Sequence, residues 1–235
     1  MSCNRTNYLI KTLESLFSYI QKYEPSLSYK LIWIDTGSMD QSYLNVELSK
    51  RYHFDQKFFF STIPKSKLHE GITTTYLYSV QFCEKTRYFL PLEEDWELVK
   101  TPKIGFIGKT IKLLDKGPHS LMGIVFKDSC RRQQPEETLN ITINDNEMHT
   151  ILYSHKRVYS YSNGGSIYRM LNMKELIGDG KLDRSQSYEL SISQAATKQG
   201  MYFGLVDFVD NCTKPPGDCH GVFHHIGIDS TWFNK

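Results

Sequence analysis

The 235-residue chain lacks three features that would assign it to a specialised class of protein. No apolar run approaches the roughly 20 residues that a membrane-crossing helix needs, so we expect no membrane span in this chain. The formal net charge is only +2, without blocks of like charge, which gives no basis for a nucleic-acid partner. The five cysteines are dispersed, which excludes a disulfide framework or a zinc site as the organising feature.

The overall amino-acid composition fits one globular domain. Hydrophobic residues make up 40% of the chain, enough for a substantial core at this length. Cys212 and Cys219 flank a Pro-Pro-Gly turn, and they form either a disulfide in an oxidising compartment or two free thiols. Asn-x-Ser/Thr acceptors at Asn4, Asn140 and Asn211 favour an ER or Golgi lumen if a membrane anchor preceded the chain; otherwise the cytoplasm is expected.

Helix-like and strand-like patterns alternate in the first half of the chain. Apolar residues recur at helical spacing over residues 7–23, which predicts an amphipathic helix. Further segments follow, with strands expected at 31–34, 58–60 and 88–92 and a helix at 71–83. This rhythm predicts a parallel sheet with helices on its faces. Because the first helix begins close to Met1, we expect a chain truncated within its first strand.

The second half is less regular. The patterns predict helices at 104–114 and 185–198, strands at 121–126, 157–162 and 201–206, and a loop-rich polar stretch at 127–147. No repeat and no sharp change of composition marks a domain boundary. We therefore expect a single domain over residues 1–235.

Two of the predicted strands end in carboxylates. Asp35 follows the strand at 31–34, and Glu93, Glu94 and Asp95 follow the strand at 88–92. Ligands of open α/β sheets bind outside the carboxyl ends of strands. Crowded carboxylates repel one another unless a cation neutralises them, and oxygen ligands favour Mg²⁺ or Mn²⁺. The alternatives are a solvated acidic turn and, for Asp35, a turn-capping role.

Several segments together resemble one family. The stretch LPLEEDWEL resembles the acidic DXD-type motif of nucleotide-sugar glycosyltransferases with the GT-A fold. Four further segments resemble other motifs of the family in the same order: SCNRTNYLIKTLESLFSYI, LIWIDTGSMD, KLDRSQSYELSISQAATKQGMYF and FHHIGIDST. The resemblance implies a Rossmann-like, mixed and mostly parallel sheet flanked by helices. Residues 1–100 would form the nucleotide-binding half and residues 101–235 the acceptor-binding half of a family-2-like, inverting, metal-dependent enzyme.

The resemblance also implies a metal site. Asp95 would ligate Mn²⁺ or Mg²⁺, and His225, or its neighbour His224, would complete the coordination sphere. Glu93 would contact the ribose, the metal or its water shell. The family more often has Asp at the position of Glu93, so water-mediated contact suits the longer side chain here.

The implied contacts with a sugar nucleotide extend over the same motifs. They comprise Asn4, Arg5, Asp35, Glu93, Glu94, Asp95, Gly164 and Gly165. Asp35 would accept a hydrogen bond from the base or ribose, and the paired glycines would form a loop under the donor sugar. Paired glycines also occur in ordinary hairpin turns.

For catalysis, the resemblance makes Glu189 the base that deprotonates an acceptor hydroxyl, with Asp183 as second choice. Alternatively, Glu189 only stabilises the first turn of a helix. The expected activity is transfer of a sugar from a nucleotide-sugar donor, by default a UDP-sugar, to a glycan, protein or lipid acceptor. The alternatives are a non-catalytic carbohydrate- or nucleotide-binding module and a sugar nucleotidyltransferase.

Overall fold

The computed structural model describes residues 5–60, 73, 76–77, 80–83, 85–98, 105–126, 137–153, 164–178, 182, 186–206 and 223–225. Its helices are α1 (Thr6–Tyr23), α2 (Gln41–Arg51), α4 (Phe106–Lys116), α5 (Met170–Gly178) and α6 (Tyr188–Lys198). Its strands are β1 (Ile32–Asp35), β2 (Gln56–Phe59), β3 (Tyr88–Phe89), β4 (Trp96–Leu98), β5 (Leu121–Val125), β6 (Glu137–Asn144), β7 (Glu147–Tyr153), β8 (Ser166–Arg169), β9 (Tyr202–Leu205) and β10 (Phe223–His225).

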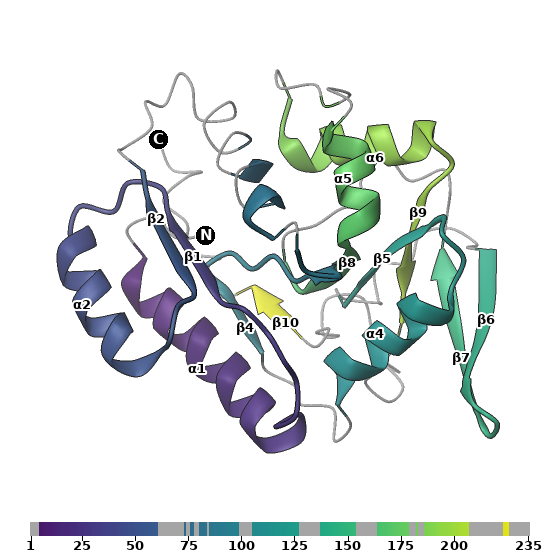
Figure 1. Ribbon diagram of the computed structural model, residues 1–235, viewed down its shortest axis with the longest axis horizontal. Coiled ribbons are helices and arrows are strands. Elements are labelled where there is room, and N and C mark those ends of the chain that lie inside the picture. Colours follow the sequence, from purple (N-terminus) through teal and green to yellow (C-terminus); the bar gives the residue numbers. More distant parts are fainter. Residues whose placement is uncertain are drawn as a thin grey trace.

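Three groups of strands form the sheets of the molecule. The largest has six strands in the order β3-β8-β5-β9-β7-β6, while β1 pairs with β2 and β10 with β4. Helices α1 and α2 lie beside β1 and β2, and the β6–β7 hairpin lies at the opposite end of the molecule (Figure 1). Among the described residues, no helix is long and apolar enough to cross a membrane.

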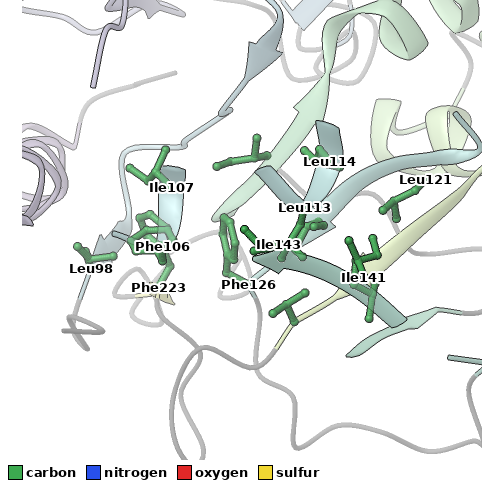
Figure 2. Close-up of a cluster of buried hydrophobic side chains, with 14 of the residues drawn as sticks. Leu98, Phe106, Ile107, Leu113, Leu114, Leu121, Phe126, Ile141, Ile143 and Phe223 are labelled. Carbon is green, nitrogen blue, oxygen red and sulfur yellow. The ribbon is translucent and has the colours of Figure 1, made fainter. Parts of the chain in front are cut away.

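The central strand β5 contributes to two hydrophobic clusters. Neighbouring side chains of a strand point to opposite faces, and a register shift between Leu121 and Gly123 changes the phase of this alternation. Leu121 and Ile124 join a cluster with α1, α4 and Phe223, part of which is shown in Figure 2. Met122 and Val125 join the second cluster, with α5 and α6. Burial of each such side chain contributes about 1.5–3 kcal/mol. The sheet is therefore covered by helices on both faces.

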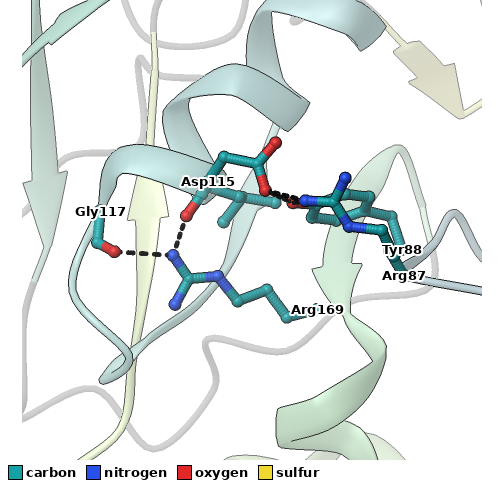
Figure 3. Close-up of polar contacts among 6 residues, drawn as sticks. Arg87, Tyr88, Asp115, Gly117 and Arg169 are labelled. Atoms are coloured by element: carbon teal, nitrogen blue, oxygen red, sulfur yellow. Dashed lines mark hydrogen bonds and ion pairs between the residues drawn. The ribbon is translucent and has the colours of Figure 1, made fainter.

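Strand β3, which leads toward the acidic segment, is tied to the end of α4 (Figure 3). Arg169, the last residue of β8, donates to the backbone oxygen of Gly117 at 2.8 Å and so satisfies a carbonyl at the carboxyl end of α4. Arg87 and the Tyr88 hydroxyl both contact the Asp115 carboxylate. Since β3 pairs with β8, these contacts fix the strand that precedes the acids.

The α/β class with helices around a mixed sheet, predicted from the sequence, is confirmed. The helix expected at 7–23 is α1, and those expected at 104–114 and 185–198 are α4 and α6. The strand expected at 157–162 and the Cys212–Cys219 pair lie outside the described residues.

Two expectations about the sheet were wrong. Among the described strands, only β1–β2 and β5–β9 pair in parallel, whereas five pairs are antiparallel. The described strands thus pair mostly antiparallel, because β8 runs opposite to both of its neighbours and a hairpin is added at one edge. That hairpin is the second correction. Part of the stretch expected as loop, residues 137–144, is β6, whose Ile141 and Ile143 alternate with exposed polar residues.

Candidate functional site

The acidic segment Glu93–Asp95 lies between β3 and β4 and is held in place by α1. The Thr12 hydroxyl donates to the backbone oxygen of Glu94 at 2.7 Å, and Ser15 Oγ accepts from the Leu98 amide at 3.0 Å. Both contacts come from one face of the helix, three residues apart. The Asp95 residue is only 4% exposed. Asp95 is therefore inside the molecule, and Glu93 and Glu94 are partly buried beside it, so the alternative of a solvated acidic turn does not describe the segment.

Arg5, the residue that precedes the first turn of α1, contacts two of these acids. Its Nη1 donates to Asp95 Oδ2, and its Nε lies 3.9 Å from Glu94 Oε1. The side chains of Arg5, Glu94 and Asp95 are 19%, 12% and 5% exposed. The amino end of a helix carries partial positive charge, so both the helix and the guanidinium stabilise negative charge here.

The third acid, Glu93, contacts α6. The Tyr188 hydroxyl donates to Glu93 Oε1 at 3.1 Å. The Tyr188 ring stacks on Tyr76 with centroids 4.8 Å apart and planes 13° apart. Burial, together with the nearby carboxylates of Glu93 and Glu189, raises the pKa of Tyr188, so the phenol keeps its proton. This hydrogen bond joins α6 to the acidic segment.

Burial and the nearby negative charges make it energetically unfavourable for the acidic side chains to ionise. Burial raises the pKa of Glu93, and the charges of Glu189 and Asp95 raise it further. Burial raises the pKa of Glu94 to about 7, with added contributions from Asp95 and Glu93. Glu189 directly follows Tyr188, the residue that donates to Glu93, in the first turn of α6. Four carboxylates therefore share one electrostatic environment.

Asp35 behaves as the turn-capping alternative predicts. Its carboxylate accepts from the amides of Gly37 and Ser38 at 3.1 and 2.8 Å, and from the Ser38 hydroxyl at 2.7 Å. Gln41 Nε2 donates to the same carboxylate at 2.8 Å. These bonds close the turn between β1 and α2. A contact between Asp35 and a nucleotide stays a prediction.

The paired glycines have a structural explanation. A Cβ atom on Gly164 would lie 2.0 Å from the Trp96 ring, so the ring packs directly on its backbone. Gly165 has a φ of +61°, and its Cβ would lie 2.4 Å from the Phe223 ring. Leu92 also forms an isolated bridge with Gly164. The glycines thus lie beside the acidic segment, where they permit close packing; their role under a donor sugar is untested.

Of the implied metal ligands, His225 is placed only through its backbone. Strand β10 pairs with β4 so that His225 lies opposite Trp96, the residue directly after Asp95, and His224 lies opposite Glu97. The two histidine side chains, together with Asn4 and Asp183, lie outside the described residues.

The described residues contain no cluster of three or more His, Cys, Asp or Glu side chains arranged to hold a metal ion. The chemistry of the donors that are described nonetheless fits a hard divalent ion. Glu93 and Asp95 offer carboxylate oxygens, and the raised pKa of Glu93 indicates that an added cation would stabilise its charged form. Mn²⁺ or Mg²⁺ therefore stays a prediction.

Sequence reasoning missed the residues that support the acids. Tyr76 and Thr12 carry no local signal for such a role, and Tyr188 carries little, because each contacts a residue far away in the chain. The adjacency of Tyr188 to Glu189 is the one hint that the sequence offered.

Comparison with known proteins shows the fold. No protein-family profile and no curated protein sequence matches the chain. Among solved structures, it is similar to residues 1–349 of S. aureus TarS in complex with UDP, with a TM-score of 0.52 and 15% identity. A second structure of TarS 1–349 gives a TM-score of 0.54 and 14% identity. Both matches cover 91% of this chain and 56% of the TarS chain. TarS is a glycosyltransferase, so the chain has a glycosyltransferase-type fold, consistent with a GT-A-like arrangement.

Proposed function

We propose that this chain is a glycosyltransferase that binds a UDP-sugar at the acidic segment and transfers the sugar to an acceptor hydroxyl. The observation that carries the proposal is the convergence of three elements on one set of buried carboxylates: the amino end of α1, the loop before β4 and the first turn of α6. The similarity to TarS, solved in complex with UDP, supports UDP as the donor nucleotide.

Diphosphate binding would use the amino end of α1. The helix dipole and the Arg5 guanidinium both favour an anion, and arginine binds phosphate oxygens in bidentate fashion. Asp95, Glu93 and His225 would hold Mn²⁺ or Mg²⁺, which neutralises charge on a departing diphosphate when bound. Tyr188 keeps Glu93 oriented through its 3.1 Å hydrogen bond.

Glu189 would act as the base. From the first turn of α6 it would take the proton of the acceptor hydroxyl as that oxygen attacks the anomeric carbon, which inverts the configuration. Base catalysis of this kind contributes about 10²–10⁴-fold. Asp183 is the second candidate for the base. The acceptor would be a glycan, a protein or a lipid.

Calorimetric titration of UDP, GDP and CDP, each with and without Mn²⁺, tests the binding step. We expect Mn²⁺-dependent binding of UDP that Asp95→Ala abolishes. The matched control is Glu47→Ala, which removes an acid paired with Lys50 at the surface of α2 and should leave binding intact. Absence of binding by all three nucleotides to folded wild-type protein would refute the proposed site.

Hydrolysis and transfer assays with UDP-sugars test the chemical step. Glu189→Gln should retain UDP binding and lose about 10²-fold or more of the turnover. Full turnover by this variant would exclude Glu189 as the base, and Asp183→Asn would then be measured. Nucleotide binding by wild-type protein without turnover of any donor would favour the non-catalytic binding module.

A further inference from the structure

We propose, building on the proposed function, that Arg5 is an internal counter-ion of Asp95 that competes with the divalent cation, so that nucleotide and metal bind cooperatively. In the ligand-free protein the guanidinium lies on the acids. A bound diphosphate draws the guanidinium away and thereby admits the metal.

The contacts of Arg5 support the first step. Its guanidinium donates to Asp95 Oδ2 through Nη1, and its Nε lies 3.9 Å from Glu94 Oε1. Asp95 is the residue that the metal proposal needs most. Because its side chain is only 5% exposed, a cation at Asp95 and the guanidinium would be screened poorly from each other by water. Repulsion between like charges therefore makes the two partners of Asp95 competitors.

The surroundings determine which partner can move. The acidic segment is fixed to α1 by the Thr12 bond to Glu94 and the Ser15 bond to Leu98. The Arg5 backbone is fixed as well, because its carbonyl accepts from the Leu9 amide at 3.0 Å. The long side chain of Arg5 can rearrange more readily than that of Asp95, because it has several rotatable bonds and is 19% exposed, against 5% for Asp95. We infer that the guanidinium moves while the carboxylates stay.

A diphosphate supplies the alternative partner for the guanidinium. Arg5 lies at the amino end of the 18-residue helix α1, whose dipole also attracts the phosphate oxygens. Transfer of the guanidinium from Asp95 to phosphate leaves the number of charge-assisted hydrogen bonds similar. It frees the Asp95 carboxylate for the divalent ion. Each ligand thus increases the affinity for the other by the same factor.

The experiment measures Mn²⁺ binding from the electron paramagnetic resonance signal of free Mn²⁺, with and without saturating UDP. It compares wild type, Arg5→Gln and, as a control, Arg51→Gln. Arg51 makes an exposed surface pair with Glu14 at 3.2 Å, with both side chains 53% exposed. In wild type and Arg51→Gln, UDP should increase Mn²⁺ affinity by a factor within the usual coupling range of about 5–150. In Arg5→Gln, Mn²⁺ should bind more tightly without nucleotide, and the increase caused by UDP should shrink.

The outcomes separate this inference from the proposed function. If Arg5→Gln binds Mn²⁺ alone no better than wild type, and UDP strengthens Mn²⁺ binding equally in both, the inference is wrong and the metal-dependent site stands. If wild type and Arg5→Gln both fail to bind Mn²⁺ with UDP present, the metal site fails, and the inference fails with it. Circular dichroism of each variant shows whether the fold is kept.

Discussion

Glu24 provides the sharpest test of how the fold is held together. It follows the last residue of α1, and its carboxylate reaches the amino end of α4, where it accepts from the Ile107 amide at 2.9 Å and the Gly108 amide at 2.6 Å. The Tyr19 hydroxyl accepts from the Phe106 amide at 2.7 Å. Three of the four amides that a helix start leaves without internal partners are thus satisfied by Tyr19 of α1 and by Glu24 directly after it.

The expected cost of removing the carboxylate follows from these bonds. Glu24→Ala leaves two largely buried amides without acceptors, at about 1–3 kcal/mol each. It also removes a negative charge at a helix amino end, worth about 0.3–1 kcal/mol. We therefore expect Glu24→Ala to lower the free energy of unfolding by about 2–7 kcal/mol. Glu24→Gln keeps one acceptor oxygen for the two amides, so it should cost less, about 1–4 kcal/mol.

Equilibrium unfolding in urea at 25 °C measures both changes, provided that the transition is two-state. Glu14→Ala is the matched control, because Glu14 lies on the exposed side of the same helix and its surface pair is worth about 0–1 kcal/mol. A loss below 1 kcal/mol for Glu24→Ala would show that water satisfies the amides of α4 equally well, and the reasoning would be wrong.

Three further changes test the site region. Gly164→Ala should lower the unfolding free energy by about 1–3 kcal/mol and alter tryptophan fluorescence, since its Cβ would lie 2.0 Å from the Trp96 ring; unchanged unfolding would contradict this packing. Tyr188→Phe keeps the ring but removes the donor to Glu93, so we expect the free energy of unfolding to fall by about 1–3 kcal/mol; an unchanged free energy would show that this bond is absent. Because the pKa of Glu94 is raised to about 7, metal-free protein should lose stability as the pH rises from about 4.5 through 7. Glu94→Gln should flatten that dependence in pH-resolved unfolding, and an unaltered pH profile would disprove it.

The parts of the fold that could be predicted from the sequence are those in which apolar residues recur at a regular spacing. Helix α1 buries Leu9, Leu13 and Leu16 along one stripe, which made it visible from spacing alone. Helix α2 was missed because it buries only Leu44 and Leu48, while other apolar side chains of the same helix face outward. The strand β6 did show alternation of apolar and polar residues, but its polar composition hid that signal.

The candidate site was predicted as a set of separate motifs, and its connections were not. Neither the contact of Arg5 with Asp95 nor that of Tyr188 with Glu93 has a local signature, because each spans at least 90 residues. Such contacts depend on the packing of α1 and α6 around the acidic segment. The turn-capping alternative for Asp35 could be stated from the sequence, since that role is decided by neighbouring residues.

The pairing of β4 with β10 has a consequence for how the protein is made. His225 lies opposite Trp96, so the strand that follows the acids finds this partner more than half the chain later. Contacts of such long sequence separation close large loops and form late in folding. During synthesis from the amino end, β4 cannot pair with β10 until residues 223–225 have left the ribosome. A nascent chain therefore exposes its acidic segment long before β10, the strand that pairs with β4 directly after that segment, has been synthesised.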